Sequence, residues 1–290
     1  MEKLKNKVAP WVFLAIPLIF LFTFTYLPVA NMIGYSFTSW DGIDKTKDFV
    51  GLDNYIKIFE DPKIFRVFFV SLYYFVASFV QIAIALYLAT VLSFSVRFRG
   101  LFKGILFFPY MINGVAVGFI FLYLFQGGGA LDITLSILGL ESLIQQWLGN
   151  PDIVNVSLAG TSIWRYMGLN MVLFIGAIAS IDPQLFEAAE IDGANKWQQF
   201  RYIISPGIKR ITQLTLILAI SGSLNVFEVP YIMLMGANGT ETFVIQTVSK
   251  AFQFGKFGLA SAMAVVLLVL VLAVTGIQRL IVKDERAELV

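Results

Sequence analysis

Two ionisable side chains, Arg165 and Glu228, fall inside long apolar stretches of this 290-residue sequence. A charge in a membrane-crossing segment is costly, so it marks a candidate functional position. The two residues could form a structural ion pair, Arg165 could extend toward an interface, or both could contact a substrate. All three interpretations remain open at the level of the sequence.

The residues around these two charges have the chemistry of a sugar site. The amides of Asn170 and Asn225 can bind hydroxyl groups, and aromatic faces can stack on pyranose rings. For each aromatic residue alone, helix packing is the better explanation, whereas the cluster together indicates a substrate pathway. Its predicted members are Trp164, Arg165, Tyr166, Asn170, Asn225, Phe227, Glu228 and Tyr231.

A polar, charged stretch at residues 181–207 separates two of the apolar segments and predicts two short helices. Asp182 and Pro183 suit a helix N-cap and first position, and Gly193 allows a break. Asn195 followed by Gln198 is typical of a second capping signal. Pro206 is expected to close the second helix.

The chain contains no histidine and no cysteine, which excludes imidazole catalysis, thiol nucleophiles, disulfides and the usual zinc or haem sites. It also lacks the G-x-x-x-x-G-K-[ST] phosphate loop, so ATP would have to be bound by another polypeptide. We expect no catalytic residues, no metal, no cofactor and no nucleic-acid partner.

The composition is that of an integral membrane protein, with 58% hydrophobic and 14% charged residues. A soluble domain carries about 25% charged residues. The apolar blocks have the length that crosses a bilayer, about 20 residues each. The expected fold is therefore all-α, with six transmembrane helices near 11–33, 64–94, 104–125, 156–180, 211–235 and 259–282.

Several connecting features are also predicted. A short amphipathic helix is expected at 51–62, with Tyr55, Ile58 and Phe59 on one side. Pro109 and Gly114 are expected to kink or unwind the third span. The loop at 127–151 is expected to carry an amphipathic piece that ends near Trp147. The first apolar segment is too long for a signal peptide and is expected to be retained.

The distribution of basic residues orients the spans. Six spans put both termini on one side, and most lysines and arginines lie on that side, which predicts that the termini and residues 181–207 are cytoplasmic. These residues are Lys3, Lys5, Lys7, Arg97, Arg99, Lys103, Lys196, Arg201, Lys209, Arg210, Arg279, Lys283 and Arg286. The chain is expected to divide into an N-terminal part, 1–63, and a core, 64–290.

The segment 187–194, EAAEIDGA, resembles the EAA signature of bacterial ABC importer permeases. The matching positions are Glu187, Ala188, Ala189, Asp192, Gly193 and Ala194, followed by Pro206. Segments 51–59, 164–194, 227–242 and 258–268 are similar to the carbohydrate branch of that family. The match departs from the common pattern at Ser205-Pro206, at Lys209 and in the segment 235–242.

The resemblance implies a permease of a type I ABC importer, located in the bacterial cytoplasmic membrane. It would form half of an alternating-access path for an oligosaccharide and couple to its ATPases through 181–207. The implied partners are a second homologous permease, two cytoplasmic ATP-binding subunits, an extracytoplasmic sugar-binding protein, the sugar and the lipid bilayer.

Other functions are less well supported by the residues. A membrane-embedded enzyme would need a convergent polar constellation, and Glu228 has no evident acidic partner. A proton- or sodium-coupled carrier usually shows repeated halves and more intramembrane carboxylates. Within the permease class, a carrier of glycerol phosphate is the alternative, although a phosphate needs more basic groups than Arg165 alone.

Overall fold

The computed structural model describes residues 2–94 and 96–281, and the regular structure of that part is helical apart from an isolated bridge between Thr38 and Phe49. The predicted charged tail, with Lys283 and Arg286, lies outside the described residues. The chain packs into two compact units, Met1–Ile64 with Gln246–Leu272, and Phe65–Ile245 with Ala273–Val290. The predicted division at residue 63 stays a prediction.

Five helices or helix pairs in the described part are long and apolar enough to cross a membrane: Phe13–Tyr35, Pro62–Ser93, Pro151–Ala179, Lys209–Leu234 and Phe257–Leu280. A sixth span results if the bent pair Arg99–Met111 and Gly114–Phe125 is counted as one. These segments coincide with the predicted spans within a few residues.

The first unit begins with α1 (Glu2–Leu21), the π-helical turn η1 (Phe22–Tyr26) and α2 (Leu27–Tyr35), and then α3 (Asp53–Glu60). On α3, Ile58 is fully buried and the Tyr55 hydroxyl lies 2.7 Å from Ser36 Oγ. Phe59 lies four positions after Tyr55, on the same side of the helix. Its side chain is 66% exposed, so it lies at the edge of the buried face.

A buried amide fixes the chain that enters α3. The Asn54 side chain donates to the carbonyls of Ser36 at 2.9 Å and Thr38 at 2.8 Å. In the same unit, the Gly258 N–H donates to the Trp40 carbonyl at 2.9 Å, next to the Trp40 and Phe257 rings. Asn54 thus satisfies two backbone acceptors of a segment that has little regular structure of its own.

Replacing Asn54 by alanine is expected to destabilise this unit by about 2 kcal/mol, because two carbonyl acceptors lose their partner. Thermal unfolding in detergent measures the effect. Lys57→Ala, at an exposed position of the same helix, is the control and should leave the melting temperature unchanged. Equal melting temperatures for the two variants would contradict the assignment.

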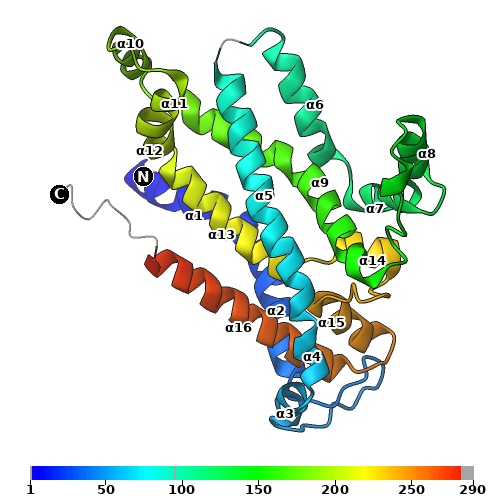
Figure 1. Ribbon diagram of the computed structural model, residues 1–290. Coiled ribbons are helices and arrows are strands. Elements are labelled where there is room, and N and C mark those ends of the chain that lie inside the picture. The colour runs from blue at the N-terminus through cyan, green and yellow to red at the C-terminus, as the bar shows by residue number, and fades with distance from the viewer. Residues whose placement is uncertain (1, 95, 282–290) are drawn as a thin grey trace. The chain divides into compact units, whose positions relative to one another are not determined.

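The second unit is built on the pairing of α5 (Phe68–Ser93) with α9 (Pro151–Ala179), which lie side by side in Figure 1. α6 (Arg99–Met111) packs on α9, and α13 (Lys209–Leu224) packs on α5. Small buried residues of α5, Ala85 and Ala89, allow the helices to approach closely.

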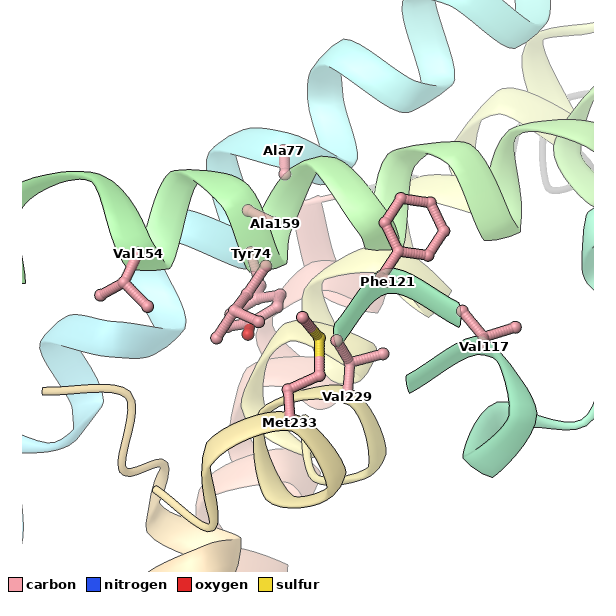
Figure 2. Close-up of a cluster of buried hydrophobic side chains, with 9 residues drawn as sticks. Tyr74, Ala77, Val117, Phe121, Val154, Ala159, Val229 and Met233 are labelled. Carbon is pink, nitrogen blue, oxygen red and sulfur yellow. The ribbon is translucent and has the colours of Figure 1, made fainter. Parts of the chain in front are cut away.

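Two hydrophobic clusters hold this unit together. Figure 2 shows the first, in which α5 and α9 meet α7 (Gly114–Phe125) and α14 (Glu228–Leu234). Its buried members are Tyr74, Ala77, Val117, Phe121, Val154, Leu158, Ala159, Val229 and Met233. The second cluster joins the other ends of α5 and α9 to the segment after α9, through Ile204 and Ile208.

Two of the spans are interrupted. The third consists of α6 and α7, which meet at 97° across Ile112 and Asn113, so the predicted break within 104–125 is confirmed. The Asn113 side chain caps α7 by accepting from the Val115 N–H. The fifth span, predicted as continuous, stops at Leu224 and resumes at Glu228.

The loop before α9 contains α8 (Ala130–Ile137) and a 3-10 turn, η2 (Glu141–Leu143). The predicted end of the amphipathic piece near Trp147 is therefore wrong, since the helix ends at Ile137. The Trp147 indole instead donates to Asp132 Oδ1 at 2.8 Å and closes the loop. Further helices of the two units are α4 (Pro62–Arg66), α15 (Phe243–Phe252) and α16 (Phe257–Ile281).

Candidate functional site

The Arg165 and Glu228 side chains form an ion pair between α9 and α14, with Nη1 and Oε2 at 2.6 Å. Arg165 lies at the middle of α9, and Glu228 is the first residue of α14, directly after the interruption of the fifth span. The guanidinium side chain is 11% exposed and the carboxylate side chain is 53% exposed. The pair therefore turns its carboxylate outward and its guanidinium inward.

Two glycines of α7 bring this helix against α14 at the ion pair. A Cβ at Gly114 would overlap the Glu228 carboxylate and lie 2.7 Å from Arg165 Nη1. One turn later, a Cβ at Gly118 would lie 2.6 Å from Ile232 Cγ2. This spacing of glycines is typical of close helix contacts in membranes. From the sequence, Gly114 is predicted only as a kink, and Gly118 is not predicted as a contact position.

The structure brings some of the predicted pathway residues to this pair. The Arg165 guanidinium lies 5.1 Å from the centre of the Tyr166 ring. The centre of the Tyr110 ring, on α6, lies 6.1 Å from the centre of the Tyr166 ring. Phe227 and Tyr231 stack on each other at 4.7 Å beside Glu228 in the sequence. An aromatic surface thus accompanies the charged pair.

Other predicted pathway residues have local roles. Trp164 packs edge-on against Phe121 at 5.1 Å, next to the cluster of Figure 2. The Asn225 amide donates to the Ser221 carbonyl at 2.8 Å, where α13 ends. Asn170 is half-buried on α9. The assignment of these residues to a substrate pathway stays a prediction.

The stretch 181–207 forms two helical pieces joined at a tight turn. α10 (Pro183–Ile191) begins at Asp182, whose side chain accepts from the Gln184 N–H at 2.9 Å. Gly193 has a φ of +76°, its N–H donates to Glu190, and the Ala194 N–H donates to Ala189. These two bonds form a Schellman motif, which favours glycine at the left-handed position.

The second piece begins with the predicted capping box. Asn195 Oδ1 accepts from the Gln198 N–H at 2.9 Å, and Gln198 Oε1 accepts from the Asn195 N–H at 2.8 Å. α11 (Lys196–Gln199) continues through a π-helical turn, η3 (Phe200–Ile204), into α12 (Ser205–Gly207). Pro206 lies inside α12, which ends at the next residue, Gly207, close to the predicted end of the second helix. Because proline lacks an N–H, the ladder is rearranged before it.

The stretch is anchored on one side and exposed on the other. Ile204 and Ile208 are buried in the second cluster, with Phe186 and Phe200 packed against it. Glu187, Ala188 and Asp192 are exposed, and Ala189 and Ala194 are half-buried. Four large apolar side chains also point outward, and we call them the exposed apolar group: Leu185, Ile191, Trp197 and Tyr202, which are 54%, 87%, 65% and 70% exposed.

A surface ion pair bridges the turn at Gly193. Lys196 Nζ lies 2.8 Å from Glu190 Oε1 and lowers the pKa of that carboxyl below its ordinary value, first through this hydrogen bond. The pair stabilises the folded state at a pH above the ordinary pKa of glutamate. This stabilisation is lost as the pH falls through the lowered pKa of Glu190. Because both side chains are exposed, the pair orients the turn without adding much stability.

Comparison with known proteins identifies the family. Residues 81–287 match the model of the binding-protein-dependent transport system inner membrane component. The chain belongs to this family. It is 32% identical to the probable ABC transporter permease protein YurN of Bacillus subtilis, with 98% of this chain and 99% of YurN covered.

The chain is also similar to two other transport proteins. It is 29% identical to the multiple sugar-binding transport system permease protein MsmF of Streptococcus mutans, covering 96% of each chain. Its fold matches a chain of a bacterial alginate ABC transporter, crystallised with an alginate pentasaccharide-bound periplasmic protein. That match has a TM-score of 0.82 at 20% identity, and it covers 96% of this chain and 95% of the other.

These findings confirm the predicted all-α membrane fold of a type I ABC importer permease and the prediction that the chain transports and is not an enzyme. The chain is an inner-membrane component with several spanning helices, and it works in a binding-protein-dependent system.

Proposed function

We propose that this permease forms half of the transmembrane path of an ATP-driven oligosaccharide importer. The observation that carries the proposal is the anchored, outward-facing stretch 181–207 in a chain of this family. Similar proteins such as MsmF are named as parts of sugar transport systems, which supports an oligosaccharide as the cargo. The aromatic and amide residues near Arg165 have the chemistry that sugar hydroxyls and ring faces require.

The stretch 181–207 would dock on an ATPase subunit. The exposed apolar group supplies four large side chains that a partner could cover, and Glu187 and Asp192 of the same stretch can accept hydrogen bonds. Small Ala188 and Ala189 allow a close approach to a groove. Since this chain lacks a phosphate loop, ATP would act on it through contacts that differ between two states of the partner.

The assembly would contain a second homologous permease, two cytoplasmic ATP-binding subunits and an extracytoplasmic sugar-binding protein. Both termini and the stretch 181–207 would lie in the cytoplasm, as the basic residues predict. The stretch is packed on the ends of α5 and α9, so a movement of the ATPases would be passed directly to both helices. Alternating access would follow from that movement.

Glycerol phosphate is a poorer cargo for this path. A phosphate requires uncompensated basic groups, and in the described spans the central arginine, Arg165, is already paired with Glu228. An uncharged cargo fits this balance better.

Replacing Glu187 by lysine is expected to reduce ATP-dependent sugar uptake about tenfold or more, because a like-charge or unpaired contact at a docked surface costs several kcal/mol. Radiolabelled uptake and co-purification of the ATPase subunits are the measurements. Glu141→Lys, an exposed carboxylate in the loop before α9, is the matched control. Unchanged uptake and co-purification for Glu187→Lys would show that 181–207 does not dock the ATPase.

A further inference from the structure

Within the described spans, the Arg165–Glu228 pair is the group of charged side chains that lies in the middle of a span. The other charged residues of those spans lie close to a helix end: Lys63, Arg66, Arg99, Lys103, Asp152, Lys209, Arg210 and Arg279. An ion pair in the middle of a span is costly to bury, and a fold retains it at a position with a specific role.

The exposure of the pair shows what it faces. The Glu228 side chain is 53% exposed, although its partner is at the middle of α9. A carboxylate at that depth is not stable against lipid tails. The face of the chain that carries Glu228 must therefore be covered by polar protein or by the aqueous cargo path.

The surroundings hold this carboxylate in place. Arg165 Nη1 donates to it, and the absence of a side chain at Gly114 lets it approach the start of α7. The positive end of a helix dipole favours an anion at that place. The positive charge of Arg165 is thus balanced by the Glu228 carboxylate, which is the more exposed member of the pair.

We propose that Glu228 is the specificity-determining residue of this path, which makes it select uncharged sugars over anionic ones. This inference rests on the proposed function, since it concerns the cargo of the same path. An uncharged ring can donate its hydroxyls to the exposed carboxylate. An anionic sugar is repelled by the like charge of Glu228. The Arg165 guanidinium, which could bind the anion, is 11% exposed and already paired with Glu228.

The test uses two probes that differ only at C6, methyl glucoside with a neutral hydroxymethyl group and methyl glucuronide with a carboxylate. Ligand-observed saturation-transfer NMR on the assembled importer in lipid nanodiscs, without the binding protein, gives the ratio of glucuronide to glucoside binding. We expect Glu228→Gln to raise this ratio about tenfold or more, because the positive charge of Arg165 then has no negative partner. Glu141→Gln removes an exposed carboxylate in the loop before α9 and should not change this ratio.

Two further variants keep the test decisive if Glu228→Gln does not assemble. Arg165→Gln leaves the carboxylate alone and is expected to lower the ratio. The double variant R165Q/E228Q differs from Arg165→Gln only in the charge at position 228, so its ratio must be higher than that of the single variant.

A ratio that does not change when the charge at position 228 is removed would overturn the inference. A merely structural role of the pair would weaken both probes together and leave the ratio constant. The proposed function fails separately, if the assembled wild-type importer shows no ATP-dependent sugar uptake. Uptake of a neutral sugar together with a constant ratio would contradict the specificity inference alone.

Discussion

Replacing Gly168 by alanine is expected to lower the stability of the second unit by about 3 kcal/mol, because the extra methyl group has no room. A Cβ at Gly168 on α9 would overlap the Leu106 carbonyl oxygen and lie 2.8 Å from the Phe107 Cα of α6. These are backbone atoms, so no side chain can turn away. The two helices must separate, and thermal unfolding in detergent measures the cost.

The same helix supplies the matched controls. A Cβ at Gly160 or at Gly176 would meet nothing within 4 Å. Alanine at either position removes the flexibility of a glycine inside a helix, which stabilises by about 0.5–1 kcal/mol. We therefore expect unfolding temperatures to fall for Gly168→Ala and to stay equal or rise for the controls. The same loss of stability at all three glycines would contradict the close crossing of α6 and α9.

Replacing Gly193 by valine is expected to reduce sugar uptake about tenfold or more while the chain remains folded, because a β-branched residue is strained at a φ of +76°. Release of that strain breaks the two Schellman bonds and turns α10 relative to α11. The proposed docking contact then loses its geometry. The measurements are uptake and the ATPase activity that binding protein and sugar stimulate.

Asparagine is the control at position 193, since it tolerates the left-handed region far better than valine. A Cβ there meets no atom within 4 Å, so the two variants differ mainly in backbone strain. We expect Gly193→Asn to retain most of the uptake. Full uptake with valine would show that the turn does not transmit the movement of the ATPase.

The sequence was sufficient for the features that depend on neighbouring residues. The caps at Asp182 and Asn195 and the turn at Gly193 each involve hydrogen bonds within a few residues, so their signals are local. The spans were also predictable from the sequence, because a run of about 20 apolar residues suffices to identify a membrane crossing. The π-helical turn before Pro206 was not predicted, since a proline near a helix end normally indicates its end.

The tertiary structure decided what depends on distant residues. Arg165 and Glu228 were both candidates from the sequence, but three interpretations were open, and packing of α9 against α14 selected the ion pair. The roles of Gly114, Gly118 and Gly168 could not be inferred locally, because a glycine is needed there only when another helix arrives at that place.

The sequence by itself thus determined that the chain is a membrane permease with a capped, polar stretch at 181–207, since composition and short-range hydrogen bonding encode both. Only the tertiary structure decided that the third span bends by 97° and that its second half rests on the ion pair. The physical reason is that an angle between two helices is set by the surfaces that cover them, and those surfaces come from residues far away in the chain.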